Sequence, residues 1–304
     1  MNYKIENDYK LNNDQKNFIK DTIITSFPQI KLKIEKNYIK ITNLKKKDIS
    51  QIKKSIKNSI FISRGIQKRK IIFKQDKLFK FNKDPIKFLK KEGEVVNISS
   101  NLYQFQGKFL KVFRGCNNYF FELAIKKYKA IDQENPLLWP IDLYKKINYL
   151  SEFPQQSLFM IGIKKSFKNY NNFSKKYSKN KNYKTIRIEK KFFNESEYGL
   201  QPAVCDNCYY ALSNKTDLKD TIYTTYNKVF RDEKSKKNTL DRLLSFSVRD
   251  IMFVGNKNFV LNIRQKLIED IIRFLKLTSL DCSIEVADDP FFTGKANKKL
   301  FQHL

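Results

Sequence analysis

Residues 226–254 read YNKVFRDEKSKKNTLDRLLSFSVRDIMFV and carry the clearest structural signal in the chain. Residues 226–233 and 242–254 are rich in β-branched and aromatic side chains, whereas residues 234–241 between them are polar. Two such runs separated by a polar turn are typical of a β-hairpin. The sequence therefore predicts an antiparallel hairpin that ends at Gly255.

The alternation of side chains along a strand groups the polar residues of this hairpin. It places Arg231 and Glu233 on one face of the first strand. It also places Phe246, Val248 and Asp250 on one face of the second strand. If these faces match, one surface displays a guanidinium, two carboxylates and an aromatic ring.

Such a surface suits a nucleotide. Arg231 and Arg242 each offer a planar fork of donors for phosphate oxygens, and Phe246 offers a plane on which a purine can stack. The competing interpretation is a surface hairpin with ordinary Arg–Glu pairs, each worth about 0–1 kcal/mol. Spacing alone favours that simpler interpretation.

The N-terminal part of the chain predicts a small α+β domain over residues 1–78. Apolar residues recur at helical spacing in 14–26 and 46–60, and they alternate as in a two-stranded hairpin in 31–41. Residues 69–73 have the pattern of a further strand.

Residues 79–304 predict a second α+β domain with an antiparallel sheet flanked by helices. A strand beginning at Leu102 runs into a helix, and a helix over 141–150 is expected to stop before Pro154. Residues 256–276 predict an amphipathic helix, and residues 283–287 predict a strand.

An insertion of low complexity interrupts this domain at residues 164–185. It is basic and contains several Phe and Tyr, and no acidic residue occurs between Phe153 and Ile188. Such a segment is either an RNA-contacting loop with stacking rings or a solvated insertion, and the second is the commoner case.

The composition limits the class of protein. The 304 residues include 61 Lys and Arg against 31 Asp and Glu, a formal charge of +30 that favours nucleotides, nucleic acid, an acidic protein or an anionic membrane surface, unless it reflects compositional bias alone. The apolar runs are too short to span a membrane and the start lacks a secretory pattern, so we expect a cytoplasmic protein without a membrane partner.

Several kinds of active site are excluded by residue type. The single histidine, His303, is the penultimate residue, which argues against a Ser-His-Asp nucleophile or a His-rich metal site. The eight glycines form neither a GxxxxGK[ST] nor a GxGxxG motif, so phosphate chemistry would depend on arginines. Four cysteines are too few for a disulfide scaffold of this length.

The residue types at specific positions of the hairpin resemble a known motif. FRDE followed by a polar loop and R-x-x-x-F-x-x-x-D resembles motif 2 of class II aminoacyl-tRNA synthetases. LQPAVCDNCY (200–209) is similar to the strand that presents a cysteine ligand in the zinc-dependent members, and NYLSEFPQQ (148–156) is similar to motif 1. EVADDPFF (285–292) resembles a signature of the amino acid:[carrier protein] ligases, which are homologues of atypical seryl-tRNA synthetases. The resemblance covers roughly residues 100–304 and leaves residues 1–78 unassigned.

The resemblance implies roles for the hairpin residues. Arg231 would bind the α-phosphate and the amino-acid carboxylate, and Arg242 would reach the γ-phosphate. Glu233 would orient the adenine or the amino-group side of the pocket, and Phe246 would stack on adenine. The cofactor would be ATP with magnesium.

The resemblance also implies a zinc site. Cys205 and Asp250 would be ligands, with Asp250 standing where the carrier-protein ligases have glutamate. A third ligand from motif 3 has no counterpart, which leaves open a longer natural chain, a separately supplied segment or a non-catalytic copy. Cys208, three residues after Cys205, is expected to be a buried core thiol.

The function expected from the resemblance is activation of a small amino acid by ATP and its transfer to an acidic carrier protein. The first alternative is a seryl-like aminoacyl-tRNA synthetase that acts on tRNA, and the second is a non-catalytic synthetase-like module. The fold would be that of a class II catalytic domain, forming a homodimer through the segment around Pro154.

Overall fold

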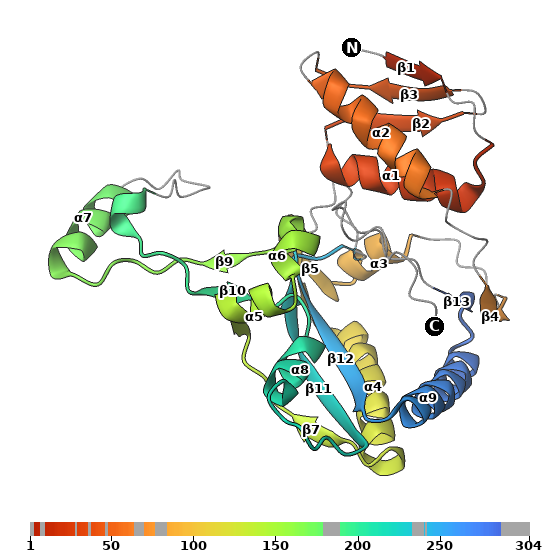
Figure 1. Cartoon of the computed structure of the whole chain (residues 1–304). Helices are drawn as coiled ribbons and strands as arrows, with labels where there is room; N and C mark the ends of the chain where they lie inside the picture. Colours follow the sequence, from red (N-terminus) through yellow and green to blue (C-terminus); the bar gives the residue numbers. More distant parts are fainter. Residues whose placement is uncertain are drawn as a thin grey trace. The chain divides into compact units, whose positions relative to one another are not determined.

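The computed structural model describes residues 3–6, 10–27, 29–35, 38–45, 48–63, 70–76, 84–178, 189–232, 240 and 242–286. Glu233, residues 179–185 of the predicted insertion and residues 287–292 lie outside this range. The chain forms two compact units (Figure 1). One consists of Met1–Leu78 with Leu275–Leu304, and the other is Phe79–Phe274.

The first unit is a three-stranded antiparallel sheet with two helices packed against it. The strands are ordered β1-β3-β2, and β4 pairs separately with β13. The elements are β1 (Tyr3–Glu6), α1 (Asn13–Ser26), β2 (Lys31–Ile34), β3 (Tyr38–Thr42), α2 (Ile49–Ser63), β4 (Ile71–Gln75) and β13 (Cys282–Glu285). The two predicted helices and the predicted hairpin are therefore confirmed.

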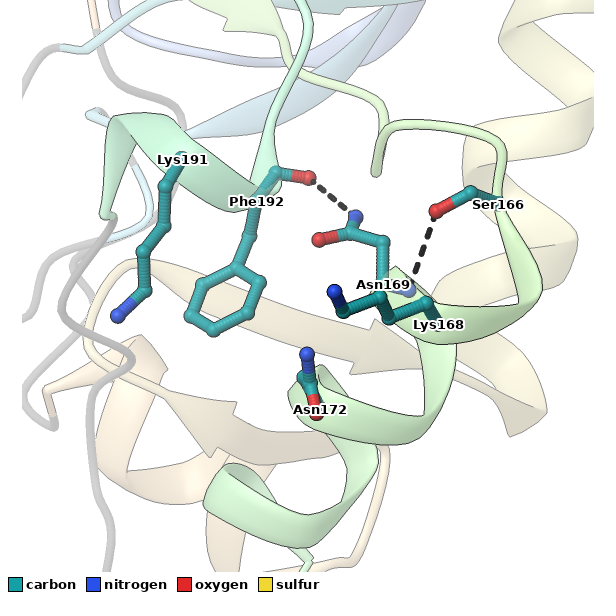
Figure 2. A pocket seen from close by; sticks show the side chains of 6 residues that line it. All are labelled: Ser166, Lys168, Asn169, Asn172, Lys191 and Phe192. Atoms are coloured by element: carbon teal, nitrogen blue, oxygen red, sulfur yellow. Dashed lines mark hydrogen bonds between the residues drawn. The ribbon is translucent and has the colours of Figure 1, made fainter.

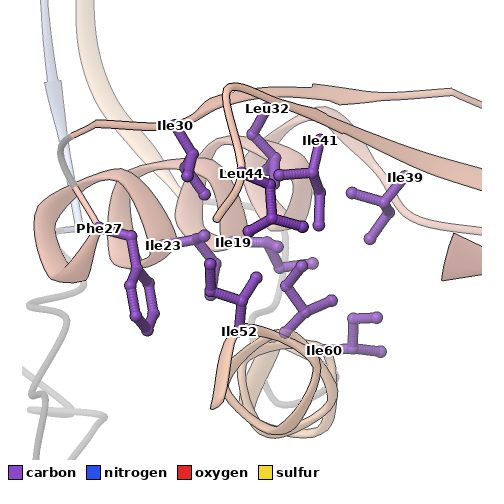
Figure 3. Packing of buried hydrophobic residues seen from close by; sticks show 11 residues of the cluster. Ile19, Ile23, Phe27, Ile30, Leu32, Ile39, Ile41, Leu44, Ile52 and Ile60 are labelled. Atoms are coloured by element: carbon purple, nitrogen blue, oxygen red, sulfur yellow. The ribbon is translucent and has the colours of Figure 1, made fainter. Parts of the chain in front are cut away.

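Isoleucines form the core of this unit because of their spacing. Ile52, Ile56 and Ile60 recur every four residues along α2, so they lie on one face of that helix and are buried. Ile39 and Ile41 alternate with polar residues along β3 and are fully buried. Figure 3 shows these side chains converging with those of α1 between the helices and the sheet.

The second unit contains the candidate site. Its strands are β5 (Val95–Ser99), β6 (Leu102–Phe105), β7 (Ile131–Gln133), β8 (Leu138–Pro140), β9 (Phe159–Met160), β10 (Tyr198–Leu200), β11 (Thr221–Phe230) and β12 (Ser245–Val254). Its helices are α3 (Pro85–Lys91), α4 (Gly107–Glu122), η2 (Leu123–Lys127), α5 (Ile141–Lys146), α6 (Tyr149–Glu152), η3 (Pro154–Gln156), α7 (Phe167–Tyr177), η4 (Lys190–Phe192), α8 (Cys205–Leu212) and α9 (Lys257–Thr278), which continues past Phe274.

The predicted hairpin is the longest pairing of the second unit. β11 and β12 pair antiparallel from Thr221 opposite Val254 to Phe230 opposite Ser245, and β7 adds to β11 in parallel. The first strand begins five residues earlier than predicted and ends at Phe230, so Arg231 lies just beyond it. The second strand begins at Ser245, three residues later than predicted.

The two faces of β12 pack against different helices. Ile251 and Phe253 lie in a cluster with Ile263 of α9. Met252, on the opposite face, packs with Cys208 and Leu212 of α8, so Cys208 is the buried thiol that we expected. Because Asp250 is two residues before Met252, the face that carries Asp250 is the one covered by α8.

A small sheet ordered β8-β10-β9 holds an aromatic core. Trp139, Tyr144 and Tyr149 are buried there, and the Trp139 and Tyr144 rings lie 5.3 Å apart. A Cβ at Gly199 in β10 would lie only 2.6 Å from the Tyr144 ring, so this position excludes a larger residue. The Tyr144 hydroxyl donates a hydrogen bond to the Leu200 carbonyl at 2.5 Å.

One predicted helix is wrong in its extent. Residues 141–150 form α5, which ends at Lys146, and only the first residues of α6. Asn148 between them has a left-handed backbone with φ of 57°, which a continuous helix cannot contain. Within the described part of the chain, no helix is long and apolar enough to cross a membrane.

Candidate functional site

Arg231 lies at the loop end of the β11–β12 hairpin, where the chain leaves β11, and several contacts fix its position. Its backbone N–H donates to the Leu244 carbonyl at 3.1 Å. Its side-chain Nε donates to the Pro202 carbonyl at 2.8 Å. The guanidinium carbon lies 5.4 Å from the centre of the Phe246 ring, within the range of a cation–π contact.

Arg231 and Phe246 lie together for a different reason from the one that the sequence predicts. We expected both residues to project from paired strands, but Val229 is the residue opposite Phe246. Arg231 reaches the ring from the first residue after the strand, because the bonds to Leu244 and Pro202 fix its backbone and side chain. Arg231 and Phe246 are therefore neighbours as predicted, but they do not project from one shared face of the two strands.

Cys205 and Asp250 also lie together. Burial raises the pKa of the Cys205 thiol to about 12, and the charges of Asp206 and Asp250 and a hydrogen bond to Asp250 act in the same direction. Burial likewise raises the pKa of Asp250, while the hydrogen bond from Cys205 and the positive charge of Arg231 oppose that rise. The Cys205 thiol therefore keeps its proton near pH 7 and donates a hydrogen bond to the Asp250 carboxylate, which also feels the positive charge of Arg231.

Two residues that the sequence analysis missed complete this cluster. Burial and the Asp250 charge raise the pKa of Asp206. Tyr209, one helical turn after Cys205, is 46% exposed, and desolvation with the charges of Cys205 and its neighbours raises its pKa to about 12. Residues four apart share a helix face, so the i and i+4 spacing of Cys205 and Tyr209 was the signal available.

That signal was hidden by an incorrect secondary-structure assignment. The segment 200–209 resembles a strand that presents a cysteine, but β10 ends at Leu200 and Cys205 is the first residue of α8. Asp206 is in the first turn of the same helix, where a carboxylate is favoured by the helix dipole. Cys205 and Asp250 therefore come from a helix and a strand, respectively.

The described residues do not complete a metal site. Among them, no group of three or more His, Cys, Asp or Glu side chains is placed to hold a metal ion. A zinc ion in a catalytic site normally has three protein ligands. Cys205 and Asp250 supply two donor atoms, so they fit part of such a site and no more.

Arg242 lies at the same end of the hairpin. Arg242 is exposed and precedes β12 by three residues, whereas Glu233 is not among the described residues. The motif 1-like segment approaches from another element, since the Asp232 N–H donates to the Gln156 carbonyl at 3.2 Å. The structure thus brings Arg231, Phe246, Cys205 and Asp250 together, with Gln156 beside them.

The curated proteins similar to this chain that are named below share one description. No family model matches the chain. It is similar to type-2 serine–tRNA ligases of Methanococcus maripaludis (22% identical over 231 residues, 74% of this chain and 45% of the relative) and Methanocaldococcus jannaschii (22% over 231 residues, 75% and 44%). The enzyme of the same name from Methanothermobacter thermautotrophicus is 22% identical over 219 residues, 70% of this chain and 42% of the relative.

A solved structure has a similar fold. The M. kandleri SerRS, crystallised in complex with A. aeolicus tRNASec, matches 96% of this chain and 58% of its own with a TM-score of 0.66 and 14% identity. The similarity confirms the predicted α+β, class II synthetase-like fold, and it extends into residues 1–78, where the sequence showed no resemblance. The chain spans less than half the length of these curated relatives.

Proposed function

We propose that the chain provides the ATP- and amino-acid-binding part of a seryl-tRNA synthetase-like ligase. It would activate a small amino acid, serine in the first instance, as an aminoacyl adenylate, with tRNA as the acceptor. The observation that carries this proposal is the placement of Arg231 against Phe246 at the end of the hairpin, beside the Cys205–Asp250 pair.

Arg231 and Phe246 would bind ATP together. Arg231 would hold the α-phosphate and the amino-acid carboxylate, and the Phe246 ring would stack on adenine. The bond from Nε to the Pro202 carbonyl orients the guanidinium before the nucleotide binds, which lowers the entropy cost of alignment. Arg242 would reach the γ-phosphate and Glu233 the adenine, and magnesium bound with ATP would neutralise phosphate charge.

The activation step needs little chemistry from side chains. The amino-acid carboxylate attacks the α-phosphorus, the bond to the bridging oxygen breaks, and pyrophosphate leaves with that electron pair. Arginines that stabilise the charge developing on the α-phosphate are expected to supply most of the rate acceleration. Such a site accelerates the reaction by positioning the two substrates and by stabilising the developing charge.

The acceptor is proposed from the relatives. Those named above are tRNA ligases, so they favour tRNA over the carrier protein that the EVADDPFF segment suggested. The formal charge of +30 suits either acceptor, since both are acidic. Transfer to a carrier protein is therefore kept as the rival that the experiment must distinguish.

The proposal includes a zinc ion with two protein donors. Cys205 and Asp250 would hold the ion, and a bound zinc would orient the amino group of the substrate. The thiol must lose its proton for this, so metal binding would release the proton of the Cys205 thiol.

Homodimerisation through the segment around Pro154 also stays a proposal. The support is that Phe159, Met160 and Ile161, which follow η3, are each about 40% exposed although they are apolar. Sedimentation of the wild-type chain beside Phe159→Ser/Ile161→Ser tests it. A wild-type dimer that becomes monomeric in the variant is expected, and a wild-type monomer contradicts the proposal.

The decisive experiment is ATP–pyrophosphate exchange with a panel of amino acids, with serine first and zinc added. The acceptor is then identified with labelled amino acid: label on tRNA is lost on ribonuclease digestion, whereas a carrier thioester survives it and is cleaved by hydroxylamine. Exchange with one small amino acid and label on tRNA is expected. ATP binding without exchange for any amino acid contradicts an enzymatic role and indicates a non-catalytic module.

A further inference from the structure

The most basic described segment of the second unit is a hairpin around α7. We call residues 161–178 together with 189–194 the α7 hairpin. It contains seven lysines and a single acidic residue, Glu189. This excess of positive charge lies outside the candidate site described above, and nothing in the proposed ATP chemistry uses it.

The two sides of the α7 hairpin are joined by backbone bonds. The Lys164 N–H donates to the Phe192 carbonyl at 2.8 Å, and the Asn194 N–H donates to the Gly162 carbonyl at 2.9 Å. The Asn169 amide donates to the same Phe192 carbonyl at 3.1 Å. The helix is therefore fixed to the returning chain.

Aromatic side chains fill the inner face of α7. The Phe173 ring lies 5.9 Å from Phe192 and 5.8 Å from Phe193, and the Tyr177 ring lies 6.2 Å from Phe192. Phe192 is only 5% exposed. These contacts leave the opposite face of the helix to the solvent.

The outer face of α7 carries lysines that no carboxylate among the described residues neutralises. Lys168 and Lys175 are seven residues apart, with Asn171 and Asn172 between them, so these four side chains form one exposed stripe. In the described part of the chain, the only carboxylate that pairs with lysines of the hairpin is Glu189, which contacts Lys176 and Lys191. Lys168 and Lys175 make no ion pair there.

A pocket opens beside this stripe, as Figure 2 shows. It has a volume of about 390 Å³ and is lined by Ser166, Lys168, Asn169, Asn172, Lys191 and Phe192. Lys168 lies beside the amides of Asn169 and Asn172 on one side of the Phe192 ring, and Lys191 of the returning chain lies on the other side. Such a lining offers hydrogen-bond donors to phosphate oxygens.

Two rings are exposed next to the lysines. Phe167 is 82% exposed and Tyr170 is 46% exposed, both in the first turn of α7. An exposed ring beside unneutralised lysines suits unpaired nucleotides, because the base stacks on the ring while the phosphate meets the ammonium group. The polar Asn and Ser residues between the lysines fit bases and sugars better than a membrane interior.

We propose that the α7 hairpin is a docking surface for unpaired nucleotides of RNA, with Lys168 and Lys175 on phosphates and Phe167 and Tyr170 under bases. The proposal deepens the proposed function, because it gives the tRNA acceptor a contact outside the candidate active site. It does not need the chain to be catalytic.

The test measures binding of the full chain to unfractionated tRNA and to a short single-stranded oligoribonucleotide as a function of salt. Lys168→Gln/Lys175→Gln is expected to lower the affinity about 10-fold or more and to make the slope of log K against log salt shallower by about 1.5. Its control is Lys257→Gln/Lys266→Gln on α9, two exposed lysines with the same change in charge.

The rings are tested separately. Phe167→Ala/Tyr170→Ala is expected to weaken oligonucleotide binding about 5-fold or more while leaving the salt slope unchanged, because stacking involves no counterion release. The control is Phe88→Ala on α3, a ring that is also 46% exposed. Circular dichroism of each variant verifies the fold.

The proposal is wrong if the α7 variants bind both RNAs like their controls, or if the wild-type chain binds neither. It is also wrong if the variants lose binding to phosphatidylserine vesicles but keep RNA binding. Measuring ATP–pyrophosphate exchange separates a failure of the docking proposal from a failure of the proposed function, because amino-acid activation needs no RNA contact at α7. Normal exchange with unchanged RNA binding overturns only the docking surface, and α7-dependent RNA binding without exchange overturns only the ligase.

Discussion

The guanidinium of Arg231 lies over the ring of Phe246, 5.4 Å from its centre, and its Nε is bonded to the Pro202 carbonyl. One face of the ring is thereby occupied by the cation. Adenine would have to stack against the remaining ring surface, so phosphate binding and base binding would meet at one pair of side chains. Three predictions concern this site.

The first concerns activity. Arg231→Ala is expected to lower ATP–pyrophosphate exchange about 10²–10³-fold, because a donor to the developing phosphate charge is lost, and Arg242→Ala should act in the same direction. Arg114→Ala, an exposed arginine of α4, is the control. Exchange at the wild-type rate in Arg231→Ala would show that the assignment is wrong.

The second concerns coupling within the pair. Because Phe246 supports the guanidinium, the effects of Arg231→Ala and Phe246→Ala on ATP affinity should not add. We expect the double variant to differ from the sum of the single variants by about 0.5–1 kcal/mol, the range of a cation–π contact. Calorimetric titration of the four proteins measures this, and strict additivity would mean that the two residues act independently.

The third concerns zinc. Removal of either donor from the Cys205–Asp250 pair should abolish stable occupancy, since a partial site has no ligand to spare. Metal analysis of purified Cys205→Ser and Asp250→Asn, with Cys208→Ser as the control thiol, provides the measurement. Full occupancy in Cys205→Ser, or none in the zinc-supplied wild type, contradicts the prediction.

A fourth prediction tests packing beneath the motif 1-like segment. Gly199→Ala places a Cβ 2.6 Å from the Tyr144 ring and should lower the free energy of unfolding by about 1–3 kcal/mol. Gly162→Ala, where no heavy atom lies within 4 Å, is the matched control and should change stability little. Urea denaturation compares the two, and equal midpoints would refute the close contact.

A fifth prediction concerns acid stability. Asp270 is 3% exposed; burial alone would raise its pKa, but hydrogen bonds from Lys127 at 2.5 Å and from Tyr128 outweigh that, so the pKa is lowered. A lowered pKa stabilises the fold above the unfolded value of about 3.9, and this contribution is lost as the pH falls through the folded value.

Asp270→Asn should therefore cost about 1–3 kcal/mol at pH 7, less than a fully buried pair because the Lys127 side chain is 43% exposed. The cost should shrink between pH 5 and 3. Urea midpoints across this pH range measure it, with Glu269→Gln on the same helix as the control. A cost that stays constant down to pH 3 would show that Asp270 does not act through its charge.

Local patterns predicted much of the fold because they reflect local forces. The alternation in 31–41 and the isoleucine spacing in 46–60 each specify an element whose buried face is already decided by the chain itself. The β11–β12 hairpin was likewise recognised, although its ends differed by three to five residues from those predicted.

Features that depend on distant partners could not be predicted. Nothing near Arg231 indicates that its side chain bonds to Pro202, 29 residues earlier. The helix start at Cys205 and the left-handed Asn148 also escaped, because tertiary packing overrode the local pattern there. The positions of Cys205 and Asp250 were anticipated only through a family resemblance, and their short-range sequence context does not show that the thiol is hydrogen-bonded to the carboxylate.

The pairing of β4 with β13 has a consequence for how the chain folds. Gln75 and Cys282 are register partners, and the Gln75 amide also donates to the carbonyls of Leu275 and Leu280. During synthesis β4 would emerge about 200 residues before its partner, and closing so long a loop slows folding. For that interval β4 would be an unpaired edge exposed to other nascent chains, so expression at low temperature or with chaperones should raise the yield of folded protein.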